Sequence, residues 1–257
     1  MKSDRPAALR QWWDNTRLVH AYWTSLVRTK RIPNVSQWMR RTRTLIDCRR
    51  ALLELPEIYQ PIMAPGFEHL EPKRPCQDRL ELILKDMPPP GATVNDMGCQ
   101  LGYFSFALAD RGYKVVGYDM LKRNIKICEM INQLSDGRSK PLFVHAKLEP
   151  ETAGLFGRVD VTLCLAIFHH IIWKEGLEKA KKLVSILRQK TLHRLYFEMG
   201  QSNEPVEPWS RYLPDMGHDP FRWIGDFLKE GGFETVRVLG VVPTHVSAVK
   251  RYLVAAD

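Results

Sequence analysis

Polar side chains that can transfer protons stand at the ends of two predicted strands. The adjacent His169 and His170 follow a β-rich run that ends at Leu165, and Glu198 closes the next such run. A neutral histidine can act as a general base toward a hydroxyl, whereas a protonated one can hold an anionic oxygen such as that of a phosphate. Glu198 can orient a histidine or bind a hydroxyl. We therefore predict His169, His170 and Glu198 as catalytic residues. The alternative for one histidine is packing beneath the sheet or capping of the next helix.

A turn with two glycines, Gly98 and Gly102, follows the strand predicted at Thr93–Met97. Glycines let the backbone turn sharply and approach a ligand closely. The spacing is neither G-x-G-x-x-G nor that of a P-loop, so the turn suits a ligand with few or no phosphates. The next strand ends at Asp119, 21 residues after Gly98, where a carboxylate can accept hydrogen bonds from both hydroxyls of a ribose. The alternative for Asp119 is that it caps the helix from Leu121 onward.

Short β-rich runs alternate with helical stretches from residue 91 onward. This alternation predicts an α/β fold, a Rossmann-like, mostly parallel sheet of seven strands with helices on both faces. Ligands of such sheets bind beyond the carboxyl ends of the strands, where the side chains above would meet. The predicted strands are Thr93–Met97, Lys114–Tyr118, Pro141–His145, Val159–Leu165, Leu192–Glu198, Glu234–Val241 and Ala248–Val254. The predicted helices are Gly102–Arg111, Leu121–Leu134, Lys174–Leu187 and Pro220–Glu230.

The motif Asp-x-Gly-Cys-x-x-Gly-x-x-Ser, followed by Val-Val-Gly-Tyr-Asp, resembles the class I S-adenosylmethionine-dependent methyltransferases. The resemblance covers roughly residues 78–254 in element order. It implies that S-adenosyl-L-methionine is the cofactor, that the loop from Gly98 to Gly102 passes its methionyl part and that Asp119 holds its ribose. The other cofactor contacts that it implies are Asp96 of the motif, Met120 and Leu148 beside the adenine, and Leu165 near the methyl donor.

Three further segments are similar to the methyltransferase domain of the bifunctional kinase/methyltransferases that cap and terminate bacterial O-antigen polymannose chains. They are residues 55–60, 76–80 and 168–171. In that family a tyrosine and an arginine before the first strand help to close over the cofactor. Tyr59 and Arg79 match those positions, and a guanidinium suits a bidentate grip on the methionyl carboxylate. We expect no space for a kinase in this chain, and hence another phosphate source or another acceptor.

The basic charge of the chain lies in its first fifth. Residues 1–50 contain 12 Lys or Arg and three Asp, a net charge of +9 that equals that of the whole chain. Two helices with apolar stripes are predicted there, one from Pro6 and one capped by Ser36. We therefore divide the chain into a basic, Trp-rich helical extension, 1–54, and a methyltransferase domain, 55–257. The tryptophans of the extension are Trp12, Trp13, Trp23 and Trp38.

Three uses of the extension remain open from the residues alone. Its stripes can pack on the chain's own core or across a homodimer interface, they can dock on an anionic membrane or a partner protein, or its cations can bind nucleic acid. Nucleic acid is disfavoured, because the charges of residues 51–257 balance. An RNA methyltransferase is also disfavoured, because no Asn/Asp-Pro-Pro-Tyr motif, which is typical of amino-group methylation, follows the fourth predicted strand.

We expect an O-methyltransferase whose acceptor is a saccharide or phosphosaccharide of a cell-surface glycan. An RNA or small-molecule methyltransferase and a non-catalytic cofactor-binding scaffold are the alternatives. No metal is expected, because the five cysteines form no C-x-x-C pair and no H-E-x-x-H motif occurs. The longest apolar run, 161–168, is far shorter than the ~20 residues that span a bilayer. These features predict a cytoplasmic protein, peripheral at the inner membrane face if the extension binds lipid.

Overall fold

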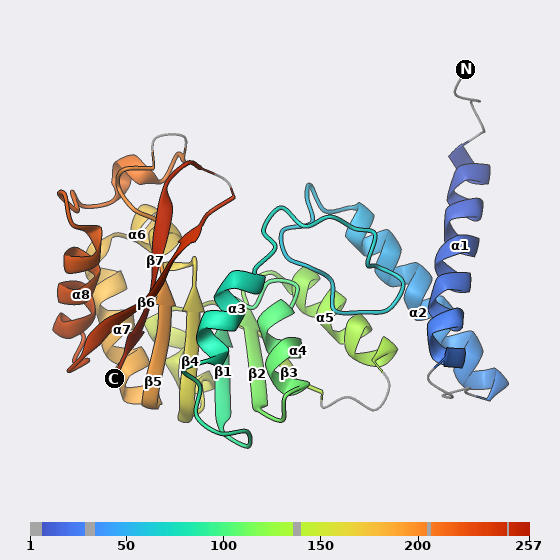
Figure 1. The fold of residues 1–257 in the computed structure, drawn as a ribbon, viewed down its shortest axis with the longest axis horizontal. Coiled ribbons are helices and arrows are strands. Elements are labelled where there is room, and N and C mark those ends of the chain that lie inside the picture. The colour runs from blue at the N-terminus through green and yellow to red at the C-terminus, as the bar shows by residue number, and fades with distance from the viewer. Residues whose placement is uncertain (1–6, 29–33, 136–139, 205–206, 246) are drawn as a thin grey trace.

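The computed structural model describes residues 7–28, 34–135, 140–204, 207–245 and 247–257, without the side chains of 7–13, 25–28 and 35. Its centre is a seven-stranded sheet in the order β3-β2-β1-β4-β5-β7-β6 (Figure 1). The first five strands pair in parallel, and β7 is antiparallel to both β5 and β6. The predicted α/β class with a mostly parallel sheet is confirmed. The strands are β1 (Thr93–Met97), β2 (Lys114–Asp119), β3 (Leu142–His145), β4 (Val159–Leu165), β5 (Thr191–Glu198), β6 (Val236–Pro243) and β7 (Lys250–Ala256).

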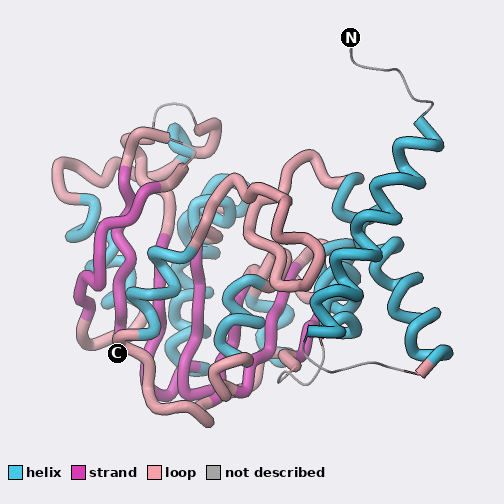
Figure 2. The backbone as a smooth tube through the Cα atoms, turned by 45° about the vertical axis from the view of Figure 1, so that its right-hand side comes forward, coloured by secondary structure: helices cyan, strands magenta, loops and turns pink. Residues whose placement is uncertain are grey.

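Helices cover both faces of this sheet, as its apolar strands require (Figure 2). The α-helices are α1 (Ala7–Arg28), α2 (Val35–Leu53), α3 (Gln77–Leu84), α4 (Tyr103–Ala109), α5 (Lys122–Leu134), α6 (Phe168–Glu175), α7 (Leu177–Lys190) and α8 (Pro220–Glu230). Two short 3-10 turns lie at Pro150–Leu155 and Ser210–Tyr212.

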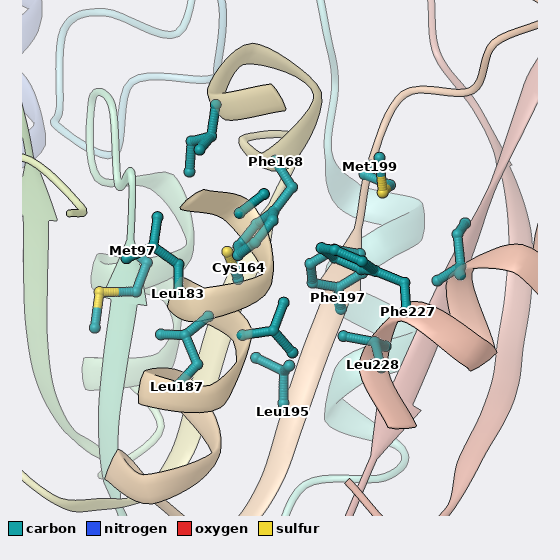
Figure 3. Close-up of a cluster of buried hydrophobic side chains, with 14 of the residues drawn as sticks. Met97, Cys164, Phe168, Leu183, Leu187, Leu195, Phe197, Met199, Phe227 and Leu228 are labelled. Carbon is teal, nitrogen blue, oxygen red and sulfur yellow. The ribbon is translucent and has the colours of Figure 1, made fainter. Parts of the chain in front are cut away.

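Two apolar cores join the helices to the sheet. On one face α3 and α4 pack against β1 and β4 through side chains such as Ile83 and Leu108. On the other face α6, α7 and α8 pack against β4 and β5. Figure 3 shows this second core, where Phe168 and Phe227 lie against Phe197 of β5. Both cores fix the carboxyl ends of β1, β2, β4 and β5 relative to one another, which is where the predicted site residues stand.

The structure corrects the predicted helices in three places. The helix expected at Lys174–Leu187 is α7, which begins only at Leu177 because Gly176 takes the left-handed φ of +86°, and the residues before this glycine form α6, which was not predicted. The helix α3 lies in a segment where none was predicted. The cap of α2 is Asn34 rather than Ser36, and the hydroxyl of Ser36 donates to the Asn34 side chain at 2.9 Å. The predicted helix start at Pro6 and the side chains of Trp12 and Trp13 lie outside the described residues.

The two N-terminal helices share a third apolar core with α5. Leu18 and Tyr22 of α1 and Leu45 of α2 are buried there together with Ile127 and Ile131 of α5. One face of the extension therefore packs on the chain's own core, as the first of its predicted uses required. Within the described residues, no helix is both long and apolar enough to cross a membrane.

Candidate active site

The loop after β1 forms one side of the candidate site. Gly98 and Gly102 take left-handed φ values of +72° and +81°, which favour glycine. The backbone N–H of Gly98 donates to the Tyr118 carbonyl of β2 at 2.8 Å, which ties the loop to the neighbouring strand. A Cβ on Gly98 would lie 2.5 Å from the Ile167 side chain. The loop thus presents bare backbone at the carboxyl end of the sheet.

Asp119 ends β2 beside this loop. Its carboxylate accepts hydrogen bonds from the backbone N–H groups of Gln100, at 3.0 Å, and Leu121, at 2.8 Å, and from the Asn124 amide at 3.1 Å. Burial raises the pKa of Asp119. The N-cap residue of α5 is Leu121, but Asp119 also holds the start of that helix, as the alternative interpretation expected, because one of its oxygens accepts from Leu121 and Asn124. The other oxygen faces the loop through Gln100, and the contact of Asp119 with a ribose stays a prediction.

Asp96 of β1 is another of the predicted cofactor contacts. It is buried, and its carboxylate accepts a hydrogen bond of 2.6 Å from the Ser105 hydroxyl of α4. Burial raises the pKa of Asp96 to about 6. Asp96 therefore links β1 to α4 beneath the glycine loop, and its direct contact with the cofactor stays a prediction.

The three apolar residues predicted near the cofactor lie at the same edge of the sheet. Met120 follows Asp119 directly and is exposed, while its carbonyl lies 3.0 Å from Nε2 of His145 at the end of β3. Leu165 ends β4 and is half-buried. Leu148 follows β3 and packs against the second core. Their contacts with the adenine and the methyl donor stay predictions.

A buried ion-pair network stands behind the carboxyl end of β5, and it includes residues that the sequence did not indicate. The Glu198 carboxylate accepts hydrogen bonds from Nε of Arg79 at 2.5 Å and from Arg74 at 2.9 Å. Arg251 of β7 lies 3.6 Å from the same carboxylate. Burial alone would raise the pKa of Glu198, but these three cations outweigh it and lower the pKa to about 2. Glu198 is therefore ionised throughout the physiological range.

Tyr59 belongs to the same network. Its hydroxyl accepts a hydrogen bond of 2.7 Å from Arg74, whose Nε–H is buried without a partner among the described residues. Arg79 also donates to the Pro243 carbonyl at 2.6 Å. Arg74 thus binds the segment before α3 to β5, and Arg79 binds α3 to β5 and to the end of β6. The predicted grip of Arg79 on a methionyl carboxylate stays a prediction.

The histidine pair follows β4 at the start of α6. His169 is buried, and its Nδ1 accepts a hydrogen bond of 2.9 Å from the backbone N–H of Gly200. Because a backbone N–H can only donate, the neutral ring of His169 holds its proton at Nε2. Burial lowers the pKa of His169 well below its usual value. His170 is exposed, and its ring lies 4.2 Å from that of His169.

Trp209 packs on this pair from the loop after β5. Its ring lies 4.3 Å from that of His169, and the guanidinium of Arg251 lies 5.3 Å from the centre of the indole. Arg251 is held by two hydrogen bonds of 2.7 Å to the buried Glu204 carboxylate. A Cβ on Gly200 would lie 2.2 Å from the indole. The Gly200 amide and the Trp209 ring thus hold His169 in place, and Arg251 contacts the same indole ring.

The sequence indicated neither Arg74 nor Arg251, because each pairs with a glutamate far away along the chain. Arg74 and Glu198 are 124 residues apart, and Arg251 and Glu204 are 47 apart. The sequence favours Trp209 and Glu204 only as residues that could line a sugar site, whereas the structure buries both, with Trp209 against His169 and Glu204 on Arg251. The described residues contain no group of three or more His, Cys, Asp or Glu side chains that could hold a metal ion.

Comparisons with known proteins find methyltransferases that are similar to this chain. No family model matches the sequence. The chain is 31% identical over 218 residues to WbdD of Escherichia coli, an O-antigen chain terminator bifunctional methyltransferase/kinase, and the match covers 81% of the chain and 29% of WbdD. It is also 31% identical over 81 residues to a ubiquinone biosynthesis O-methyltransferase of Leptothrix cholodnii, covering 32% of the chain and 34% of that enzyme. The chain thus spans about a third of the length of these relatives.

Solved structures show the same relationship. A crystal structure of WbdD superposes with a TM-score of 0.70 and 27% identity, over 82% of the chain and 47% of that structure. Magnesium protoporphyrin IX methyltransferase from Synechocystis, solved with bound S-adenosylhomocysteine, superposes with a TM-score of 0.53 and 22% identity, over 70% of the chain and 80% of that structure. The second match shows a common fold.

Proposed function

Because the chain is a homologue of S-adenosylmethionine-dependent methyltransferases and has their fold, we propose that it transfers a methyl group to a saccharide or phosphosaccharide acceptor of a cell-surface glycan. The similarity to an O-antigen chain terminator over 81% of the chain supports this acceptor class. The observation that carries the proposal is the position of the histidine pair and the Gly98 and Asp119 loops at one edge of the sheet. A cofactor and an acceptor bound there would face each other.

The residues at this edge fit S-adenosylmethionine. Gly98 leaves only backbone in the loop, where a Cβ would clash with the Ile167 side chain, and the buried Asp119 carboxylate is held by the Gln100 and Leu121 amides. Asp119 would hold the ribose, and the loop from Gly98 to Gly102 would pass the methionyl part. When bound, S-adenosylmethionine supplies an activated methyl group.

The acceptor site is assigned to the surface around His170. Aromatic rings suit the faces of sugar rings, and the half-buried Trp173 lies 6.4 Å from the His170 ring and 6.1 Å from the exposed ring of Tyr212. Partial burial, Lys174 and Arg251 lower the pKa of His170, so the ring is neutral at neutral pH. A neutral His170 would take the proton of an acceptor hydroxyl as the methyl group is transferred.

His169 and Glu198 take supporting roles in this proposal. His169 has its Nδ1 occupied by the Gly200 amide, so it would orient the neighbouring ring or donate from Nε2. Glu198 is surrounded by arginines, and it would act as a positioning residue for the segment that contains Tyr59. The proton acceptor of the pair is therefore His170.

Calorimetric titration of the full chain with S-adenosylmethionine and S-adenosylhomocysteine tests the cofactor half of the proposal. We expect Asp119→Ala to weaken binding about 10- to 100-fold, the loss of hydrogen bonds to a charged group. Asp226→Ala, which changes an exposed carboxylate on α8, is the control and should bind normally. Absence of binding by the unchanged chain would refute the enzymatic proposal.

Transfer of labelled methyl groups to a panel of acceptors tests the other half. The panel contains unphosphorylated and phosphorylated mannose oligosaccharides, phenolic small molecules and RNA. We expect label in the saccharides. Label confined to phenols would place the chain with the ubiquinone-type O-methyltransferases that it also matches, and label confined to RNA would assign the basic extension to nucleic acid.

A further inference from the structure

The outer side of α2 bears an apolar strip that the chain leaves uncovered. Met39, Ile46 and Leu53 are seven residues apart and so lie along one line of the helix. Met39 and Leu53 are each 60% exposed, and Ile46 is half-buried. A shallow depression of about 500 Å³ lies along the strip and is lined by Met39, Ile46 and the exposed ring of Trp38. A helix that packs inward on one side does not need a second apolar face for its own stability.

Arginines border this strip. Arg43 and Arg50 line the same depression, and their side chains are 87% and 59% exposed. Both lie near the carboxylate of Asp47, at 3.8 Å and 3.5 Å, which are distances at which exposed pairs contribute little. Asp47 is the one acidic residue of α2, which contains five arginines. The outer face therefore combines apolar side chains with an excess of positive charge.

The exposed apolar strip and the excess of positive charge together restrict which partner can bind the outer face of α2. A second copy of the chain would bring the arginines of two α2 helices toward each other, and like charges at close range oppose association. An anionic bilayer satisfies both features. Lipid phosphates accept paired hydrogen bonds from guanidinium groups, the long arginine side chains reach outward while their stems stay on apolar surface, and methionine and leucine side chains enter the acyl boundary. The ring of Trp38 suits the same boundary.

We propose that the outer face of α2 binds the surface of an anionic lipid bilayer, with Met39, Ile46 and Leu53 in the interfacial region and Arg43 and Arg50 on lipid phosphates. The helix is held rigidly for this contact, because its inner side is packed on α5 through Leu45. Both α1 and α2 lie at the β3 end of the molecule, opposite α8 (Figures 1 and 2). The proposal concerns the extension and is independent of the acceptor.

Flotation of the full chain with lipid vesicles tests the proposal. We expect binding to vesicles of phosphatidylcholine and phosphatidylglycerol, weakened by salt, and little binding to phosphatidylcholine alone. The double variant Arg43→Gln/Arg50→Gln should bind roughly thirtyfold more weakly, since each arginine near an anionic surface contributes about fivefold. The variant Met39→Ser/Leu53→Ser should lose at least about tenfold through its lost apolar burial.

Matched variants at other places separate this face from general charge and hydrophobicity. Arg222→Gln/Lys229→Gln removes two cations from α8, and Leu142→Ser/Leu155→Ser removes two exposed apolar side chains from elsewhere. Both should bind vesicles as the unchanged chain does. Titration with S-adenosylhomocysteine, supported by the urea midpoint, checks that each variant is folded.

Three outcomes would overturn the proposal: no binding of the unchanged chain to anionic vesicles, equal loss in the matched variants, or a dimer in light scattering that dissociates in the Met39→Ser/Leu53→Ser variant. The last outcome would assign the strip to a second copy of the chain. None of these outcomes affects the methyl-transfer assay with soluble acceptors, so failure here and failure of the proposed function are distinguishable.

Discussion

Arginines in two regions of this chain differ in what surrounds them. Arg74, Arg79 and Arg251 are each 2% exposed and are paired with buried glutamates at 2.5–2.9 Å. Arg43 and Arg50 of α2 point into solvent and share one aspartate at longer range. The basic segment that dominates the charge of the sequence is therefore not the part that builds the site. Buried arginines fix the site, and exposed arginines are available to a partner.

The largest change should come from removing the partner of the buried arginines. Glu198→Ala leaves Arg74 and Arg79 without their carboxylate in a region closed to water, and unpairing a buried charge costs about 3–5 kcal/mol. Urea unfolding of this variant and the unchanged chain measures the difference in free energy of unfolding. If Glu198→Ala lowered the free energy of unfolding by less than about 1 kcal/mol, the buried arginines would depend on their carboxylate no more than the exposed arginines of α2 do.

The second prediction concerns His170, whose side chain reaches the surface while its ring is partly desolvated against His169. This desolvation, Lys174 and the buried Arg251 lower the pKa of His170 to about 4. A histidine with a lowered pKa is a competent base above that pKa and loses activity as the pH falls through it. With a hydroxyl acceptor, we expect turnover to hold as the pH falls below neutrality and to decline only toward pH about 4. His170→Gln should lower turnover at least about 100-fold and spare cofactor affinity.

Two results would contradict that assignment. A decline of turnover centred on the usual histidine pKa would mean that burial, Lys174 and Arg251 do not lower the pKa of His170. Unchanged turnover of His170→Gln with a hydroxyl acceptor would remove its role as base. With a phosphate acceptor, which is already anionic, the same variant should lose much less.

A smaller effect on stability and turnover is expected from displacing Trp209, whose ring contacts both His169 and Arg251. Gly200→Ala puts a methyl group where only 2.2 Å separates it from the indole, so the ring must leave its present position against His169. We expect a cost of about 1–3 kcal/mol in urea unfolding. Turnover should fall, while calorimetry shows unchanged cofactor affinity. Gly154→Ala, with open space around the added methyl group, is the control, and equal effects of both variants would mean that Trp209 does not position the histidines.

The smallest effect is expected at the exposed arginines. Asp47→Asn removes the carboxylate shared by Arg43 and Arg50, and exposed pairs contribute about 0–1 kcal/mol. Stability should therefore hardly change. Binding to anionic vesicles should rise about fivefold, because one negative charge leaves the face of α2. A destabilisation comparable to that of Glu198→Ala would erase the difference between the two regions.

Local patterns were enough to predict most of the fold. The bounds of β1, β4 and α8 match the predicted ranges, because alternating β-rich runs and turn residues are local signals. The division between α6 and α7 was not predictable in this way, since it depends on the backbone angle at Gly176.

The residues of the candidate site also differ in whether local sequence patterns could predict them. Gly98 and Asp119 belong to motifs whose members are close in sequence, and the structure brings them to one edge of the sheet. That Glu198 would be enclosed by arginines was not predictable, because Arg74 and Arg251 come from a loop and a strand that only the folded sheet brings together. A buried arginine has no sequence pattern of its own.

The long separation of Arg74 from Glu198 also bears on the order in which the chain folds. The two side chains are 124 residues apart, and contacts across so long a loop form slowly compared with helices. Neither charge can leave water before the other arrives, since an isolated buried charge is costly. We therefore expect the segment before α3 to dock after β5 and β7 have joined the sheet, and its amides to be among the last to gain protection from hydrogen exchange.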